Sequence, residues 1–339
     1  MKYKLLHELP EGFLEIDVTQ IHELLGGPTL IHLKGEKNDA LYLSTLLHGN
    51  ETTSFIVLQR LLRNYQGRTL PRDIIIFVGN TLAASHGMRH LPDQVDYNRI
   101  WDHHLSPEEF LPEHHLAFDV INYAKEQNIF ASIDIHNNTG KNPNYGCINV
   151  VAEPFIDLAS HFGSHTVYFT EPHNVQSMAF AHFCTAITIE AGKPGEESGV
   201  IAAYHFVEKV LQMDELYNNP NRENPEIYHT FARMKVDKKA VIDFNDSPCV
   251  ESDLSFVSNL DENNFEVVPK GAHMGYAKNI NLIRVEDNKG FDITDDFLKI
   301  ENGELKVNRI FIPSMFTKDV YVMKEDCLGY VMELMIPTT

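Results

Sequence analysis

The sequence Leu-Tyr-Leu-Ser-Thr-Leu-Leu-His-Gly-Asn-Glu, residues 41–51, is an apolar run that ends abruptly in His48 and Glu51. A run of this length bounded by Gly49 is typical of a buried strand. Residues 52–65 then carry apolar side chains at helical spacing, which predicts a helix. His48 and Glu51 are therefore expected where a strand turns into a helix, the edge at which open α/β sheets bind ligands.

A His and a carboxylate three residues apart can hold one metal ion, since zinc accepts imidazole nitrogen and carboxylate oxygen at about 2 Å. The pair alone is a weak signal, because a chain with 18 His and 48 acidic residues produces such pairs by chance. Taken alone, it is more simply interpreted as a solvated His beside a Glu that favours a helix start. The pair predicts a metal site only if a third ligand is found at the end of another strand.

Residues 129–136, Ile-Phe-Ala-Ser-Ile-Asp-Ile-His, supply that third ligand, because a second apolar run ends in His136. Asp134 shares a strand face with His136, and a buried carboxylate is costly unless it is paired. A natural partner is the free N–H of a metal-bound imidazole. We therefore expect Asp134 to support either His48 or His136. The alternative is a strand-end Asp that caps the following loop.

Residues 184–192, Cys-Thr-Ala-Ile-Thr-Ile-Glu-Ala-Gly, form a third apolar run, and it ends in the acid Glu190. A carboxylate at this edge can take a proton from metal-bound water. Two His ligands and one carboxylate leave zinc an open fourth position, the pattern of catalytic rather than structural sites. Taken alone, Glu190 is more simply an exposed loop carboxylate, because charged residues are mostly solvated.

Arg89, Asn98 and Arg99 follow the predicted strand 73–79. Arginine binds carboxylates bidentately through its planar fork. In a chain with a net charge of -20, such a group beside a metal site predicts a small anionic substrate. The alternative is an ordinary loop with incidental ion pairs.

Taken together, these features resemble the zinc carboxypeptidase superfamily, and within it the succinylglutamate desuccinylase/aspartoacylase branch. Five motifs in the expected order, over roughly residues 38–200, are far more specific than any one of them. The motifs are His48-Gly-Asn-Glu51, Arg89, Asp96-Tyr-Asn98-Arg99, Asp134-Ile-His136-Asn and Ile189-Glu190-Ala-Gly.

The resemblance implies one zinc ion per chain, ligated by His48, Glu51 and His136. It also implies that Glu190 is the general base, which activates the zinc-bound water and then protonates the leaving amine. The physical chemistry of amide hydrolysis is compatible with these roles, because bound zinc lowers the pKa of water to about 7.

By the same resemblance, Arg89 polarises the scissile carbonyl, while Asn98 and Arg99 hold a substrate carboxylate. Branch members also use a tyrosine near the substrate, for which Tyr276 and Tyr321 are both candidates. The loop before Asp96 departs from the branch pattern, and this leaves the fit of the substrate open.

Three functions follow from these assignments. The first is hydrolysis of the amide bond of a small carboxylate-bearing substrate, with an N-acyl amino acid deacylase preferred. A carboxypeptidase that removes the C-terminal residue of a peptide is the second. An inactive metal-binding regulatory module is the third, and the base Glu190 argues against it.

Composition sets the outer bounds of function. The 48 acidic against 28 basic residues argue against nucleic acid and against an anionic membrane surface. The four cysteines form no Cys-x-x-Cys pair. Without a signal peptide or an apolar run long enough to span a membrane, a cytoplasmic protein is expected. The sequence leaves a homo-oligomer open.

Alternating strand and helix patterns from residue 28 to 215 predict an α/β fold, with a mixed, largely parallel sheet flanked by helices. A polar linker at residues 217–225 separates a catalytic domain, residues 1–218, from a smaller β-rich C-terminal domain, residues 219–339. In the resembled deacylases such a domain narrows the mouth of the active site. The predicted helices are 51–65, 113–127, 154–162 and 196–213. The predicted strands are 29–33, 40–47, 73–79, 129–135, 147–151, 165–169 and 184–190, then 226–235, 239–242, 265–268, 280–285, 297–300 and 304–312, with a hairpin turn at Asn302-Gly303.

Overall fold

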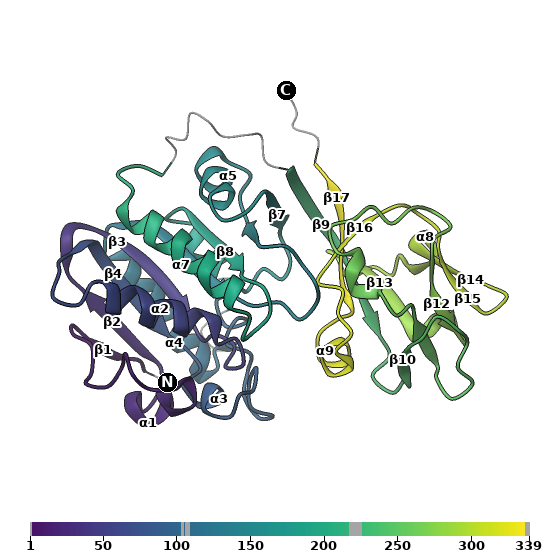
Figure 1. The fold of residues 1–339 in the computed structure, drawn as a ribbon, viewed down its shortest axis with the longest axis horizontal. Helices are drawn as coiled ribbons and strands as arrows, with labels where there is room; N and C mark the ends of the chain where they lie inside the picture. Colours follow the sequence, from purple (N-terminus) through teal and green to yellow (C-terminus); the bar gives the residue numbers. More distant parts are fainter. Residues whose placement is uncertain (1, 103–104, 106–108, 217–225, 336–339) are drawn as a thin grey trace. The chain divides into compact units, whose positions relative to one another are not determined.

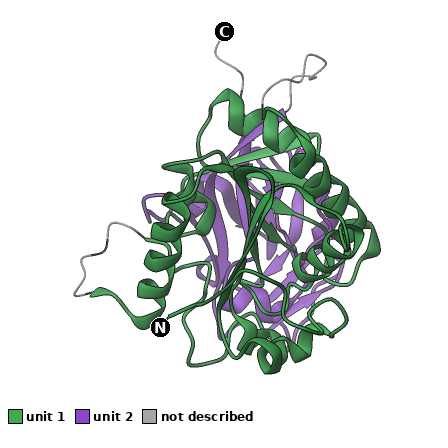
Figure 2. Cartoon of the chain, turned by 90° about the vertical axis from the view of Figure 1, so that its left-hand side faces the viewer, with its two compact units in different colours: residues 1–137, 144–225 green, residues 138–143, 226–339 purple. Residues whose placement is uncertain are grey.

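The chain forms two compact units in the computed structural model, which describes residues 2–102, 105, 109–216 and 226–335. The first unit comprises residues 1–137 and 144–225, and the second comprises residues 138–143 and 226–339 (Figure 2). Our predicted boundary at 218/219 and the predicted linker lie in residues 217–225, outside the described residues. Residues 138–143 belong to the second unit although they begin only two residues after β5, a strand of the first unit that ends at His136.

The first unit is built on one mixed sheet with the strand order β1-β2-β4-β3-β5-β8-β6-β7. The central strands β4, β3, β5 and β8 are parallel to one another, whereas β2 pairs with β4 and β6 pairs with β8 in antiparallel fashion. The predicted mixed, largely parallel sheet is therefore confirmed. The strands are β1 (Lys4–Leu6), β2 (Thr29–Leu33), β3 (Gly35–Thr45), β4 (Leu70–Val78), β5 (Ile129–His136), β6 (Tyr145–Ile148), β7 (His165–Phe169) and β8 (Ala186–Glu190).

Helices flank this sheet on both faces (Figure 1). Helix α2 packs against α7 and contacts β3 and β5, while α4 contributes to a hydrophobic cluster with Tyr42, Phe77 and Trp101. The four predicted helices end within two residues of the observed bounds. The helices are α1 (Ile21–Leu25), α2 (Thr53–Asn64), α3 (Thr81–Ser85), α4 (Pro112–Lys125), α5 (Glu153–Ser160), α6 (Gln176–Ala181) and α7 (Glu197–Gln212), with the 3-10 turn η1 (Val18–Gln20).

The register of the central strands gives the two faces of the sheet different chemistry. Leu43, Ile133 and Ile187 lie in one row and are fully apolar, whereas Ser44, Asp134 and Thr188 lie in the next row. Side chains alternate between faces along a strand, so one face carries a buried polar row. Two residues further along the strands, on the same face, His136 is in register with Glu190.

The second unit is β-rich, as predicted. Strand β9 (Glu226–Val236) pairs with β13 (Ile283–Asp287) and β17 (Gly329–Leu334), and β17 pairs with β16 (Ile312–Ser314). A second sheet has the order β10-β11-β12-β15-β14. Its strands are β10 (Ile242–Phe244), β11 (Leu254–Phe256), β12 (His273–Ala277), β14 (Leu298–Glu301) and β15 (Glu304–Val307), and the remaining elements are α8 (Thr294–Phe297), α9 (Val320–Glu325), η3 (Leu260–Asn263) and η4 (Ile280–Leu282).

The turn at Asn302-Gly303 joins β14 and β15 with positive φ at both residues, 53° and 82°, as a primed two-residue hairpin requires. Three strand predictions in this unit were wrong. Residues 238–239 form a turn and β10 begins only at Ile242, residues 265–268 contribute a single bridge, and the predicted strand 304–312 is broken between β15 and β16. Strands β11, β12 and β17 were not predicted, because β-propensity depends strongly on packing context.

Candidate active site

The turn after β3 brings His48 and Glu51 together. Leu46 has a left-handed backbone with φ of 52°, which is rare for a residue with a branched side chain. A Cβ atom on Gly49 would lie 2.2 Å from the backbone nitrogen of Ala84, so this position requires glycine. The Glu51 N–H donates to the His48 carbonyl across the turn at 3.2 Å.

A buried cluster of His48, Glu51 and His136 lies at the carboxyl end of the sheet. The Nδ1 atom of His48 lies 2.7 Å from Oε1 of Glu51, and Nδ1 of His136 lies 2.7 Å from Oε2 of the same carboxylate. One ligand atom from each residue lies within 4.8 Å of the other two. The three residues predicted to bind zinc are thus brought together, with both Nδ1 atoms facing one carboxylate.

A second carboxylate lies behind each imidazole. Nε2 of His136 lies 2.7 Å from Oδ2 of Asp134, and Nε2 of His48 lies 3.1 Å from Oδ1 of Asp96. Of the two partners that the sequence left open for Asp134, the structure shows contact with His136. The contact of Asp96 with His48 was not anticipated, because Asp96 lies in a loop and strand periodicity gives no information there.

The hydrogen-bond capacity of the two imidazoles tests whether a cation fits. Each ring has a carboxylate oxygen against both nitrogens, but a neutral imidazole has a single N–H to donate. Either each ring carries an extra proton, or a cation lies between the Nδ1 atoms and Glu51. Two nitrogens and a carboxylate suit zinc, and the outer carboxylates would fix the tautomer that leaves Nδ1 free to coordinate. The residues present therefore fit a zinc ion.

The electrostatics of the cluster lead to the same interpretation. Burial disfavours charge on Glu51, yet the adjacent His48 and His136 hold its pKa well below the usual range. Burial likewise opposes protonation of His136, but Asp134 and Glu51 raise its pKa well above the usual value. For Asp96, burial is outweighed by His48 and Arg89, which hold its pKa well below the usual range. The carboxylates thus create a strongly negative buried site that favours a cation.

Glu190 lies at the end of β8, in register with His136. Burial raises the pKa of this carboxyl to about 8, although His136 opposes the shift. Its Oε2 atom is buried and has no hydrogen-bond partner among the described residues. Glu190 is therefore a carboxyl group able to gain or lose a proton near neutral pH.

The two arginines differ in their surroundings. Nε and Nη2 of Arg89 contact Oδ2 of Asp96 at 3.0 and 2.9 Å, which fixes the guanidinium beside the His48 side of the cluster. Arg99 donates from Nη1 to the Asn98 carbonyl at 2.9 Å. In the part of the chain that the structure describes, no carboxylate lies within ion-pair distance of Arg99. Arg99 is therefore available to an external carboxylate.

Asn98 faces the cluster of His48, Glu51 and His136. Its Oδ1 accepts from the backbone N–H of Gln176 at 3.0 Å, which directs Nδ2 toward Nε2 of His136 at 3.3 Å. The residue is only 7% exposed. Asn98 thus packs against His136, and its contact with a substrate carboxylate stays a prediction. The contribution of Gln176 has no signal in the sequence, because it comes from a short helix distant along the chain.

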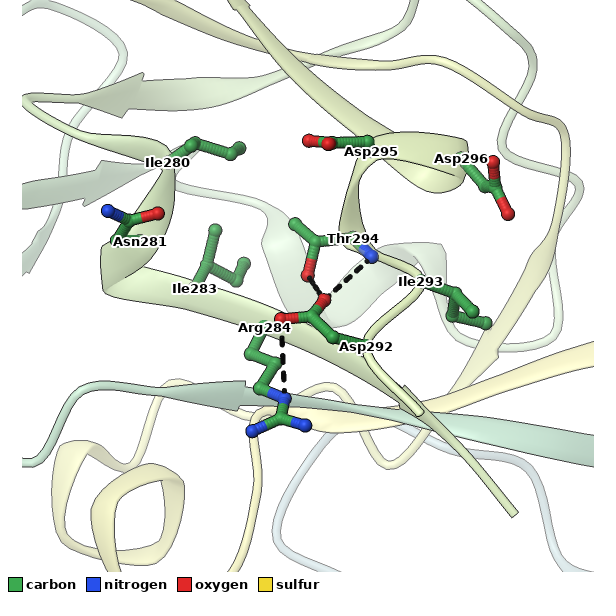
Figure 3. A pocket seen from close by; sticks show the side chains of 9 residues that line it. All are labelled: Ile280, Asn281, Ile283, Arg284, Asp292, Ile293, Thr294, Asp295 and Asp296. Carbon is green, nitrogen blue, oxygen red and sulfur yellow. Dashed lines mark hydrogen bonds and ion pairs between the residues drawn. The ribbon is translucent and has the colours of Figure 1, made fainter. Parts of the chain in front are cut away.

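The second unit holds the two tyrosines considered from the sequence. Tyr276 lies on β12 with its ring 4.9 Å from that of His273, and Tyr321 on α9 is 66% exposed. A cavity of about 340 Å³ in this unit lies between η4, β13 and α8 (Figure 3). Asp292 accepts there from Thr294 and pairs with Arg284 at 3.5 Å. None of the predicted site residues lines this cavity.

Comparison with known families places this geometry in context. The family model described as the succinylglutamate desuccinylase/aspartoacylase catalytic domain matches residues 37–208, just over half of the chain. The chain belongs to this family. It is a family of hydrolases, and the matched segment contains every residue of the predicted site except the two candidate tyrosines, Tyr276 and Tyr321.

Solved structures show the same fold. A succinylglutamate desuccinylase/aspartoacylase from Rhodobacter sphaeroides matches with a TM-score of 0.59 and 15% identity, over 91% of this chain and 89% of that one. The succinylglutamate desuccinylase of Chromobacterium violaceum matches at 0.53 and 17%, over 88% and 86%. Murine aminoacylase 3 matches at 0.53 and 14%, over 88% and 96%. Curated protein sequences give no significant match. Among the described residues, no helix is long and apolar enough to cross a membrane.

Proposed function

We propose that this protein is a zinc-dependent hydrolase of amide bonds in small carboxylate-bearing molecules, most specifically an N-acyl amino acid deacylase. One observation carries the proposal. Glu51 lies 2.7 Å from Nδ1 of both His48 and His136, while Asp96 and Asp134 contact the opposite ring nitrogens. Family membership supports the reaction class, since the family is named for enzymes that remove acyl groups.

His48, Glu51 and His136 would hold the zinc ion. When bound, zinc supplies Lewis acidity, which polarises a carbonyl and acidifies water. Glu190 accepts a proton from the attacking water and returns it to the departing amine. In the metal-free site burial raises the pKa of Glu190 to about 8, and a bound cation would lower it towards neutral pH, where a proton carrier works best.

Arg89 and Arg99 have separate tasks in this proposal. Arg89, held by Asp96 through two of its nitrogens, donates to the oxygen that becomes negative when the amide carbonyl is attacked. Such a donor in a preorganised site is worth about 3 kcal/mol. Arg99 binds the substrate carboxylate through its planar fork, which holds the amide in place for attack.

The test is release of amine from a panel of N-acetyl, N-formyl and N-succinyl amino acids and free dipeptides, with zinc-loaded protein. A Glu190→Gln control should retain zinc and lose turnover by about three orders of magnitude or more. Turnover of an N-acyl amino acid that disappears in the control would support the deacylase. Turnover of peptides alone would indicate a carboxypeptidase, and no turnover with zinc bound would favour a regulatory module.

A further inference from the structure

Asn137 directly follows His136 and is only 6% exposed. Its Oδ1 accepts from the backbone N–H of Thr53 at 3.3 Å. Its Nδ2 lies 2.9 Å from Oγ1 of Thr53, 3.1 Å from the Ala191 carbonyl and 3.0 Å from the Gly192 carbonyl. Three oxygens around one amide nitrogen determine the orientation of the side chain. Every polar atom of this amide is therefore hydrogen-bonded.

These bonds join the three segments that carry the proposed chemistry. Thr53 begins α2 two residues after Glu51, and Ala191 directly follows Glu190. The backbone N–H of Asn137 also donates to Oε2 of Glu51 at 3.0 Å. One residue is thus bonded to the segment of the carboxylate ligand and to the segment of the base, while it is covalently attached to His136.

Asn137 provides the side-chain capping bond that the N-cap residue of α2 does not make. Thr52 is the N-cap residue of this helix and makes no side-chain capping bond. The first N–H groups of a helix have no partner within it, and Asn137 satisfies that of Thr53 from a different strand. The start of α2, with Glu51 just before it, is thereby anchored to the end of β5.

After β8, Asn137 donates to the Ala191 and Gly192 carbonyls, on one side of the loop that follows Glu190. A Cβ atom on Gly199 of α7 would lie 2.1 Å from the Ala191 carbonyl, so α7 packs closely against the same peptide. Aspartate has the shape of asparagine but lacks its N–H donors, and its carboxylate would face the Ala191 and Gly192 carbonyls. Serine is too short to replace the amide. Either change leaves buried polar groups without partners.

We propose that Asn137 is a positioning residue that sets the location of Glu190 relative to Glu51 and His136, without contacting the substrate. The inference rests on the proposed function, in which Glu190 carries the proton. Side-chain variants keep the backbone N–H that binds Glu51, so metal binding should change little. Displacement of Glu190 should instead lower kcat, because proton transfer needs its partners within hydrogen-bond reach.

The experiment compares Asn137→Asp and Asn137→Ser with Gln59→Ala as the matched control. Gln59 is 7% exposed, and its amide donates to the Phe13 and Ile16 carbonyls at 2.9 Å each. The Gln59→Ala variant therefore loses similar bonds, and the side-chain amide of Gln59 makes no hydrogen bond with a described residue of the site. The measurements are zinc affinity, kcat and KM on the N-acyl amino acid that the wild type cleaves fastest, and hydrogen exchange in residues 51–56 and 190–196.

We expect zinc-loaded Asn137 variants to lose kcat by about 100-fold with KM within about 3-fold, because geometry rather than binding is lost. Exchange should accelerate in both segments. Gln59→Ala should lower the melting temperature and leave kcat within about 2-fold. If the Asp variant does not fold, the Ser variant and Thr53→Val, which removes the Oγ1 acceptor, provide the same readouts.

The inference is overturned by a kcat within about 3-fold of wild type, by unchanged exchange in both segments, or by a kcat that excess zinc restores. The last result would mean that Asn137 only helps to retain the metal. If the wild type cleaves nothing in the panel, the proposed function fails by itself. Exchange and zinc affinity then still decide whether Asn137 holds the two segments together.

Discussion

His136 and Asp134, two residues apart on β5, form a buried pair in which the imidazole Nε2 lies 2.7 Å from the carboxylate Oδ2. The strand itself creates this pair, because residues at positions i and i+2 face the same side. Once the ring is neutral, as metal binding requires, the carboxylate holds its Nε2–H and leaves an unprotonated Nδ1 on the other edge. In this site that edge faces Glu51.

Asp134→Asn should weaken zinc binding by about 10- to 100-fold, because the outer carboxylate orients the ring and raises its basicity. Competition with a chelator of known affinity measures the change. Asp73→Asn is the matched control, since Asp73 is 2% exposed and contacts His32 at 3.2 Å outside the cluster. The control should lower stability and leave zinc affinity unchanged. Equal affinity in wild type and Asp134→Asn would contradict the role of Asp134.

Zinc binding near neutral pH should release about one proton or more per ion. Asp134 and Glu51 raise the pKa of His136 well above its usual value despite burial, so they favour the charged form of the metal-free ring. Glu51 contributes no proton, because its pKa is held well below the usual range. Titration calorimetry in buffers of different ionisation enthalpy gives the number directly. A binding enthalpy independent of buffer would show that His136 does not have to lose a proton.

The sequence predicted the parts of the site that depend on strand ends. His48, His136 and Glu190 each terminate an apolar run, and parallel neighbouring strands bring such ends to one edge of the sheet. The contact of Asp134 with one of the two predicted His ligands followed from strand alternation, whereas the choice of His136 over His48 required the three-dimensional structure. Periodicity cannot choose between two rings on adjacent segments.

Loop residues and short strands were harder to predict. Asp96 lies in a loop, where no periodic pattern indicates direction, so its contact with His48 was not predicted. Gln176 reaches Asn98 from a six-residue helix far along the sequence. In the second unit, β12 contains Gly275 with φ of 138°, a residue type depleted in strands, and it was not predicted. These features arise from tertiary packing rather than from local pattern.

Glu190→Gln should make the metal-free protein more stable at high pH. Burial raises the pKa of Glu190 from 4.5 to about 8 in the fold. A raised acid pKa contributes stability that is complete below the unfolded value and is lost progressively as pH rises through the folded value. Glutamine is uncharged throughout, so its advantage should be near zero at about pH 4.5 and grow until about pH 8.

Thermal unfolding after chelation, across this pH range, measures the difference, which should reach a few degrees in Tm. Gln59→Ala, a change of a buried amide outside the site, should show no such pH dependence in its Tm difference. A Tm difference between Glu190→Gln and wild type that stays constant with pH would mean that Glu190 is not strained by burial.

Arg99 should determine affinity for the substrate carboxylate. It has no ion-pair partner among the described residues, so its fork is available without breaking an internal ion pair. Arg99→Lys keeps the charge but loses bidentate geometry, and we expect KM to rise about 10-fold, with a larger rise of about 100-fold for Arg99→Ala. Steady-state kinetics on the preferred N-acyl amino acid measures both, and Arg60→Lys, at an exposed pair with Glu197, should leave KM unchanged.

A double-mutant cycle separates this role from a general electrostatic effect. Replacing the substrate carboxylate by a primary amide should raise KM for the wild type by about as much as Arg99→Ala does with the acid substrate. If Arg99 and the carboxylate contact each other, Arg99→Ala combined with the amide substrate should raise KM little more than either change alone. Full additivity would place the carboxylate elsewhere. Arg89 already binds Asp96. If the substrate carboxylate does not contact Arg99, it would therefore have to bind a cationic group other than these two arginines.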